Sequence, residues 1–207
     1  MKRVWCWMGL GLFLASALLA EDIRLPEPRR SGGMPLMEAL AQRRTERDFS
    51  SEPLPPQMLS DLLWATFGIN RPDGKRTAPS ARNMQEIDIY VALPGGLYLY
   101  DPAENKLKHL LDNDLREQVG RQPFTQRAPV GLIFVADESR MRGDKEFYAA
   151  IDTGYISQNT YLFCASEGLH TVALGMVDKP LLHRLMGLRE DQTIILTHPV
   201  GFPPDHP

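Results

Sequence analysis

The chain has 207 residues, of which 43% are hydrophobic and 24% charged, proportions that are typical of one globular domain and exclude a disordered or fibrous chain. Its formal net charge is −3, so no overall positive field is available to hold nucleic acid or an anionic membrane surface. We therefore expect no nucleic-acid partner, and any bound anion must meet a local cluster of basic residues.

The first twenty residues have the layout of a secretory signal peptide. Lys2 and Arg3 precede an apolar run from Val4 to Leu19, which Ala20 closes. We therefore predict a signal peptide over residues 1–20, a periplasmic or secreted protein, and no integral membrane domain after cleavage. The alternative is an uncleaved segment that anchors the protein in the inner membrane.

The chain beyond this segment begins with an extended stretch and two helices. Residues 21–34 are rich in Pro, Arg and Gly, which indicates an extended lead-in rather than a packed element. The domain proper is predicted over residues 35–207. Its first helices are expected at 35–44 and 56–67, and a long polar loop at 68–86 follows, which in a compact domain is typical of a functional segment.

Strand patterns follow the loop. Residues 87–93, 96–100 and 106–111 are separated by turn residues and predict an antiparallel meander. An apolar run at 129–136 predicts a central strand, and a strand, a helix and a last strand are expected near the C-terminus. Helices interleaved with antiparallel strands indicate an α+β domain, with a central, mostly antiparallel sheet that helices flank.

The longest helical segment covers residues 144–167 and ends at Gly168. Small side chains along it allow close approach of another helix, and its amides at Gln158 and Asn159 need partners in the core or across an interface. The sequence leaves these two alternatives open. Cys164 lies in an apolar part of this segment, which indicates a buried and inert thiol.

The densest basic cluster follows the first predicted helix. Arg43, Arg44 and Arg47, with the hydroxyl of Thr45 between them, present several forked donors that suit a phosphate group. The alternative is that these cations stabilise the carbonyl groups at the helix C-terminus, at about 0.3–1 kcal/mol each. Three guanidinium groups exceed what such capping needs, and this favours an anion site.

A second polar group lies at the end of the long loop, directly before a predicted strand. Ser80, Asn83 and Gln85 offer neutral donors and acceptors, which suit the edge of a heterocycle whose rim alternates N–H and C=O groups. The alternative is a turn in which these side chains bond to their own backbone.

No other pattern predicts chemistry. The five His show no metal-ligand spacing, and no nucleophile elbow, P-loop or dinucleotide-binding glycine motif is present, so we expect no metal and no catalytic side chain. Asp152 and Glu167 are interpreted as acids near the ends of their helix rather than as proton donors.

Four ordered landmarks resemble the nitroreductase family over roughly residues 35 to 202. They are the RR-T-x-R element at 43–47, the A-P-S-A-x-N-x-Q element at 78–85, the helix from 152 to 169 and the Leu-Gly-Met at 174–176. The segment at 64–71 further resembles the subgroup that includes azoline-oxidising dehydrogenases.

The resemblance implies an α+β homodimer with FMN at the subunit interface and the long helix in that interface. It implies that Arg43, Thr45 and Arg47, with Arg44 as a further candidate, bind the FMN phosphate. The flavin's polar parts would meet side chains of the partner subunit, and backbone around Leu174, Gly175 and Met176 would approach the ring. The partner side chains so implied are Ser80, Asn83 and Gln85.

The implied reaction is ping-pong electron transfer between a reductant and a small organic substrate. The family's usual donor is NADH or NADPH, and the predicted export places that donor in question, so another reductant stays open. One departure from the family is that the chain after Gly201 carries no basic residue for the phosphate. The alternatives are a flavin-free binding module that retains the fold, and a flavin dehydrogenase that acts on heterocycles or peptides.

Overall fold

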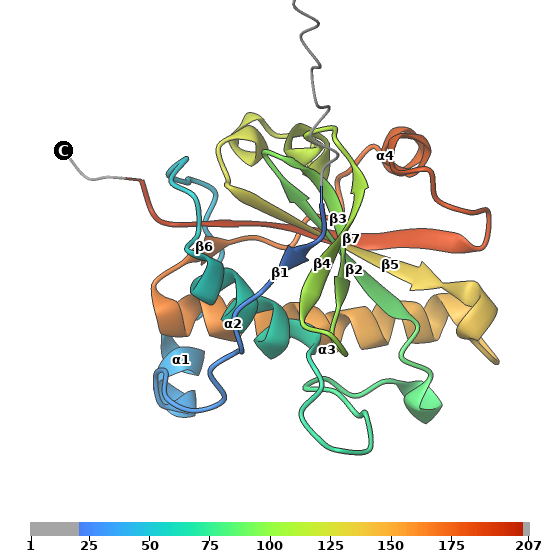
Figure 1. The fold of residues 1–207 in the computed structure, drawn as a ribbon, viewed down its shortest axis with the longest axis horizontal. Coiled ribbons are helices and arrows are strands. Elements are labelled where there is room, and N and C mark those ends of the chain that lie inside the picture. Colours follow the sequence, from blue (N-terminus) through green and yellow to red (C-terminus); the bar gives the residue numbers. More distant parts are fainter. Residues whose placement is uncertain (1–20, 205–207) are drawn as a thin grey trace, which may run out of the picture.

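A seven-stranded antiparallel sheet forms the centre of the computed structural model, which describes residues 21–204 (Figure 1). The strands are β1 (Ile23–Arg24), β2 (Ile87–Leu93), β3 (Gly96–Asp101), β4 (Lys106–Leu111), β5 (Val130–Asp137), β6 (His170–Thr171) and β7 (Gln192–Gly201). Their order in the sheet is β1-β4-β3-β2-β5-β7-β6. The predicted meander is confirmed, because β2, β3 and β4 are antiparallel neighbours in that order.

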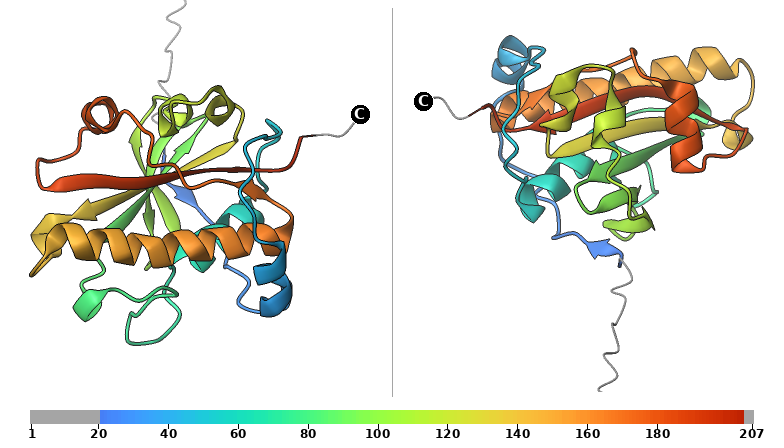
Figure 2. Two further views of the ribbon diagram at one scale, coloured as in Figure 1. Left: turned by 180° about the vertical axis from the view of Figure 1, so that it is seen from behind. Right: turned by 90° about the horizontal axis from the view of Figure 1, so that it is seen from above.

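Helices cover both faces of the sheet (Figures 1 and 2). The long helix α3 and the helix α2 pack on one face, α1 packs against α3, and α4 lies on the other face. The helices are α1 (Leu36–Gln42), α2 (Pro56–Phe67), α3 (Lys145–Glu167) and α4 (Lys179–Met186), with short 3-10 turns η1 (Ala81–Asn83), η2 (Arg116–Val119), η3 (Pro123–Gln126) and η4 (Glu138–Arg140).

The central strands are buried on both faces because their side chains alternate between two apolar cores. Leu132 and Phe134 of β5 pack into the core under α2 and α3, whereas Ile133 and Val135 pack into the core under α4. A strand covered on both faces reads as a continuous apolar run, which is why residues 129–136 could be identified as a central strand.

The helix α3 has a defined start and stop. The Asp144 side chain caps its first turn by accepting a hydrogen bond from the backbone N of Phe147 at 3.1 Å. Gly168 ends it with φ of 69°, a left-handed conformation that a residue with a side chain adopts at a cost. These two residues explain why the predicted and observed bounds of this helix agree within one residue.

Two expected elements differ from the structure. The first helix ends at Gln42, and Pro35 precedes it as the N-cap instead of being its first residue. Most of the long loop is irregular, but Ile69 pairs with Arg76 in an isolated bridge. The first helix is shorter than expected because Arg43–Arg47 leaves it as an extended segment that bonds beside β6, where Glu46 N donates to Thr171 O at 3.0 Å.

The segment 21–34 is extended but packed, so the expectation of an unpacked lead-in was wrong. Ile23 and Arg24 pair with β4 at the edge of the sheet, and the Leu25 side chain is buried. Arg29 Nε lies 2.7 Å from the buried Asp61 carboxylate on α2. The physical reason is that the edge strand β4 and the acid of α2 both need partners, which the local sequence of residues 21–34 does not reveal.

The localisation predicted from the N-terminus does not stand. Among residues 21–204, no helix combines the length and the apolar character that crossing a membrane requires. Residues 1–20, whose hydropathy was the whole basis of the signal-peptide prediction, lie outside the described residues, and nothing in the described part shows a signal peptide. The predictions of a periplasmic or secreted protein and of an inner-membrane anchor are therefore withdrawn.

Candidate functional site

Tyr161 of α3 connects the basic segment, residues 43–47, to the segment that follows β6. Its hydroxyl oxygen accepts a hydrogen bond from the backbone N of Ala173 at 2.8 Å and lies 3.1 Å from Thr45 Oγ1. Either hydroxyl can donate across this contact, and the other hydroxyl then keeps a proton that has no acceptor within residues 21–204. One hydroxyl proton of the pair is therefore left to donate to a ligand.

The three guanidinium groups of the basic segment differ in what they contact. Arg44 Nε donates to Glu46 Oε1 at 2.5 Å, so its charge is already paired. Arg43 lies over the Tyr161 ring, with 5.3 Å between Cζ and the ring centroid. Neither Arg43 nor Arg47 forms an ion pair with any residue in the part of the chain that the structure describes. Their charges are therefore available to an anion.

His198 lies beneath Tyr161 and is fully buried. Its Nδ1 is 3.1 Å from Thr171 Oγ1, and its Nε2 is 2.8 Å from Ser157 Oγ. Thr171 Oγ1 donates its proton to Pro199 O, so it can only accept from His198. The His198 ring therefore carries its proton on Nδ1 and accepts at Nε2. Burial lowers the pKa of His198 to about 3, so the ring is neutral and acts as a fixed support.

A cavity of about 570 Å³ lies between the basic segment and the C-terminal half of α3. Arg43, Arg44 and Tyr161 line it together with His170 and Pro203. The cavity therefore lies next to the guanidinium group of Arg43 and the side chain of Tyr161. The geometry suits an anionic group with an extended remainder.

The segment at 174–176 is held at the edge of the sheet. Leu174 exchanges two backbone hydrogen bonds with Thr197 on β7, and its side chain is buried. Gly175 and Met176 are exposed, and a side-chain carbon placed on Gly175 would meet no atom closer than 4.0 Å. The backbone here is therefore open to close approach by a planar ligand.

The Ser80–Gln85 loop folds around its own polar side chains. Ser80 Oγ accepts from the backbone N of Gln85 at 2.9 Å, and Gln85 Nε2 donates to Asn83 Oδ1 at 3.1 Å. Arg82, Asn83 and Gln85 have φ of 53°, 55° and 50°, a region that costs a non-glycine residue roughly 1–3 kcal/mol. The turn alternative raised from the sequence therefore describes part of this loop. Backbone strain of this kind persists only where surrounding contacts hold the loop in place.

Two buried acids lie behind this loop. Asp152 Oδ2 of α3 accepts from the backbone N of Ala81 at 2.8 Å, and the neighbouring Glu86 is fully buried at the start of β2. The interpretation of Asp152 as an acid near a helix end was wrong, because it lies inside α3 with 2% of its surface exposed. Sequence reasoning missed Glu86 because only the tertiary structure buries it.

One chain does not bring the two polar groups together (Figures 1 and 2). The Ser80–Gln85 loop contacts Asp152, and the basic segment contacts Tyr161. These two α3 residues are nine positions apart, about 14 Å along the axis and two and a half turns around it. The two polar groups therefore contact opposite halves and opposite flanks of α3.

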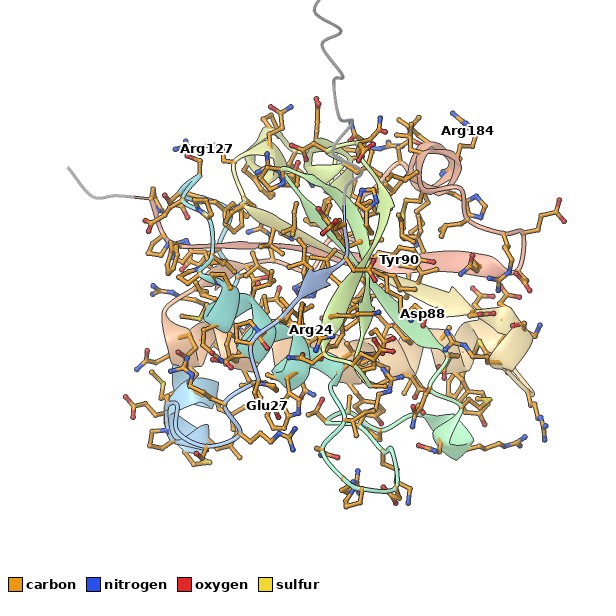
Figure 3. The ribbon with its side chains drawn as sticks, viewed as in Figure 1. Arg24, Glu27, Asp88, Tyr90, Arg127 and Arg184 are labelled. Atoms are coloured by element: carbon orange, nitrogen blue, oxygen red, sulfur yellow. The ribbon has the colours of Figure 1, made fainter. Side chains whose placement is uncertain are left out.

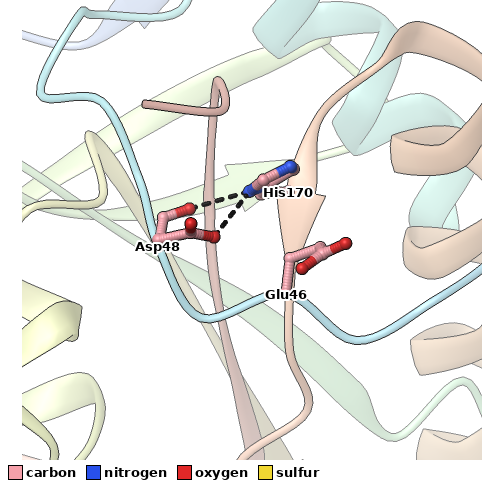
Figure 4. A group of neighbouring side chains, drawn as sticks. All are labelled: Glu46, Asp48 and His170. Atoms are coloured by element: carbon pink, nitrogen blue, oxygen red, sulfur yellow. Dashed lines mark hydrogen bonds and ion pairs between the residues drawn. The ribbon is translucent and has the colours of Figure 1, made fainter. Parts of the chain in front are cut away.

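Glu46, Asp48 and His170 form a further cluster beside the basic segment, with side-chain ligand atoms within 4.8 Å of one another (Figure 4). The sequence missed it because His170 is distant along the chain. His170 Nδ1 is 2.8 Å from Asp48 O and 3.1 Å from Asp48 Oδ1, and Glu46 pairs with Arg44. Each of the two acids already has a partner, Arg44 for Glu46 and His170 for Asp48, and we assign no metal to the cluster.

Three further residues of α3 that the sequence singled out are Gln158, Asn159 and Cys164. Cys164 is buried and unpaired, and burial raises the pKa of its thiol, so it is not a nucleophile under ordinary conditions. Asn159 donates a long bond of 3.4 Å to Thr66 O, whereas Gln158 is exposed. The signals that could have found Tyr161 and His198 are weak, since each is an isolated polar residue in an apolar stretch.

Comparison with known proteins identifies the family. The sequence model of the nitroreductase family matches residues 40–202. A nitroreductase-type protein of Methanocaldococcus jannaschii is 29% identical over 194 residues, which cover 87% of this chain and 96% of the relative. A crystal structure of a nitroreductase-type protein from Ralstonia eutropha JMP134 is 43% identical with a TM-score of 0.86, over 90% of this chain and 91% of that one.

A more distant structure shares the fold alone. The NADPH:FMN oxidoreductase from Vibrio harveyi, in complex with NAD⁺, is 21% identical with a TM-score of 0.62. The match covers 83% of this chain and 70% of the Vibrio chain.

Proposed function

The chain belongs to the nitroreductase family of oxidoreductases, and we propose that it is an FMN-dependent member which works as a homodimer. The observation that carries this proposal is the donor set of Arg43, Thr45 and Arg47. Two guanidinium groups without ion pairs among the described residues and a hydroxyl that contacts Tyr161 lie within five positions of the chain, and Arg43 and Tyr161 line a cavity. This set matches a phosphate monoester.

Among the described residues, this donor set would bind the phosphate without a cation from the C-terminal segment. The C-terminal segment contributes Pro203 to the cavity and no cation among its described residues. Arg43 and Arg47 would form the charge-assisted bonds, and Thr45, oriented by Tyr161, would donate the third. Arg44 contributes less because Glu46 already holds it.

The flavin ring would lie between the backbone of Leu174 and Gly175 and the polar side chains of Ser80, Asn83 and Gln85. The exposed backbone at 174–176 allows a flat ring to approach, and amide groups suit its rim of alternating donors and acceptors. Since the loop and the basic segment of one chain contact opposite halves of α3, we propose that a second copy supplies the loop.

The exposed face of α3 provides the surface for that copy. Phe147, Ile151 and Tyr155 lie on this face together with the exposed Gly154. A two-fold axis that lies in the plane of this interface and runs across the middle of α3 exchanges the two ends of the helix. It would carry the partner's loop toward the half of α3 that contacts the basic segment of the first chain, and would give two equal sites per dimer.

When bound, FMN supplies the redox chemistry, in which electrons from NADH or NADPH pass to a small organic acceptor. The NADPH:FMN oxidoreductase noted above supports this class of donor. The chain's own part is to hold the phosphate, to present backbone and amide groups to the ring, and to leave one ring face open to substrates in turn. No side chain needs to act as a nucleophile.

Spectroscopy of the purified protein tests this proposal. We expect a yellow protein, or a colourless one that takes up one FMN per subunit, whose oxidised-flavin absorbance bleaches when NADPH or NADH is added without oxygen. A protein that neither carries FMN nor binds it on reconstitution would contradict the proposal and favour a flavin-free module.

The heterocycle-oxidising alternative has weaker support. It depended on residues 64–71, and Trp64 Nε1 donates to Ile69 O at 3.0 Å, a bond that closes this segment on itself. A flavin that is bound but is not bleached by either nicotinamide would favour this alternative.

A further inference from the structure

We infer that Glu86 and Asp152 share one proton at neutral pH and that this proton holds the strained Ser80–Gln85 loop against α3. Both are positioning residues, since neither is placed in contact with a ligand. The importance of this loop for FMN rests on the proposed function, whereas the proton itself is a property of the chain.

Glu86 is the most thoroughly buried acid of the described residues. Its side chain is fully buried, and as carboxylate oxygens neither Oε1 nor Oε2 has a hydrogen-bond donor. A buried carboxylate without a donor is among the most costly arrangements in a protein interior. A proton on Glu86 removes this cost and allows its side chain to donate to the neighbouring carboxylate of Asp152.

The nearest cation does not neutralise Glu86. Arg140 of η4 faces it, but Arg140 Nη2 donates to the Glu86 backbone oxygen at 2.9 Å and pairs with Asp88 Oδ2 at 2.6 Å. Its Nε lies 3.5 Å from Asp137 Oδ2. Asp88, which Figure 3 labels on β2, and Asp137 thus occupy the guanidinium. The charged groups that face Glu86 from neighbouring elements are Asp152 and Arg140, and Arg140 is already paired with other acids.

Burial, and then the bond to Asp152, raise the pKa of Glu86 to about 7. Asp152 Oδ2 already accepts from the backbone N of Ala81 at 2.8 Å, whereas neither carboxylate oxygen of Glu86 has a donor. The proton therefore lies on Glu86, and Asp152 accepts from both the loop and Glu86. This arrangement ties a loop with three residues of positive φ to the middle of α3.

The sign of the pH effect follows from these contacts. Below about pH 7 Glu86 is neutral and the loop is held. As the pH rises the proton leaves to solvent, two carboxylates face each other in the interior, and their repulsion weakens the hold of Asp152 on Ala81. The loop that carries Ser80, Asn83 and Gln85 is then released.

Hydrogen exchange on FMN-free protein tests the inference directly. Backbone amides of residues 80–86 are compared between the native chain and Glu86→Gln at pH 6 and pH 8.5, after correction for the intrinsic pH dependence of exchange. Glutamine has the shape of the protonated acid and does not titrate. We expect the two proteins to agree at pH 6, and protection in the native chain to fall by about tenfold or more relative to the variant at pH 8.5.

Two further variants keep the test decisive. Asp152→Asn keeps an acceptor for Ala81 and offers Glu86 a donor, so the loss of protection at pH 8.5 should disappear, even if Glu86→Gln does not fold. Glu146→Gln, an exposed acid in the first turn of α3, should behave like the native chain. Equal pH dependence in the native chain, Glu86→Gln and Asp152→Asn would overturn the inference.

FMN titration separates this inference from the proposed function. Titration of the FMN phosphate affects both proteins alike, and we expect the native chain to lose about tenfold more affinity for FMN between pH 6 and pH 8.5 than Glu86→Gln does. Binding with the same pH dependence in both proteins would overturn the positioning role while leaving FMN dependence intact. A chain that binds no FMN at either pH contradicts the proposed function, and the exchange experiment still decides the proton.

Discussion

The hydroxyl groups of Thr45 and Tyr161 lie 3.1 Å apart and join two segments separated by 116 positions in the sequence. The contact fixes the basic segment against α3 and, through Ala173, against the segment that leads to Gly175. One phenol thus contacts both the segment proposed to bind the phosphate and the segment proposed to face the flavin.

Tyr161→Phe should weaken FMN binding about tenfold. The variant keeps the ring beneath Arg43 but leaves Thr45 and the buried N–H of Ala173 without a partner, at about 1–1.5 kcal/mol. Fluorescence titration of FMN measures the change. Tyr148→Phe, on the same helix and without a hydroxyl bond among residues 21–204, is the control. Unchanged affinity in Tyr161→Phe would refute the orienting role of its hydroxyl.

Arg43→Ala and Arg47→Ala should each lower FMN affinity by roughly 10- to 100-fold. The reason is that a charge-assisted hydrogen bond contributes about 1.5–3 kcal/mol. Arg44→Ala is the matched control within the same segment, and a smaller effect is expected because Glu46 already pairs with Arg44. The ratio of FMN to protein after gel filtration gives the result. An effect of Arg44→Ala as large as that of Arg43→Ala would contradict the assignment of donors.

Ile151→Asp should convert the proposed dimer to monomers and remove FMN at the same time. Ile151 lies on the exposed apolar face of α3, and a charge there would be desolvated in the dimer. Sedimentation velocity measures the assembly, and flavin absorbance measures the cofactor. Leu185→Asp on α4, also an exposed apolar position, should change neither. A monomeric variant that retains FMN would show that the site lies within one chain.

His198→Gln should make the fold less sensitive to acid. Burial holds the folded pKa of His198 near 3, below the ordinary value of 6.5, so the unfolded chain binds a proton that the folded chain refuses. This penalty is absent above about pH 6.5 and grows as the pH falls towards 3, reaching roughly 2–3 kcal/mol at pH 4.5. Urea unfolding at pH 7.5 and pH 4.5 measures it. Parallel losses of stability in the native chain and the variant would exclude this account.

The sequence by itself determined the α+β fold class, the antiparallel meander, the bounds of the long helix and the family. These follow from local signals: the period-two apolar pattern of the strands, the turn residues between them, and the Asp144 and Gly168 caps of α3. It also identified both polar segments of the proposed site, because unusual densities of arginine, amide and hydroxyl groups are visible in a short window.

Only the tertiary structure decided how these residues are used. Which arginines lack an ion pair depends on Glu46 reaching Arg44, and the contact that orients the Thr45 hydroxyl depends on Tyr161, 116 positions away. The packing of residues 21–34, the neutral His198 and the buried Glu86 beside Asp152 result from burial, which depends on long-range contacts. The separation of the two polar segments along α3 is likewise a property of the fold, and it is the reason for proposing a second copy.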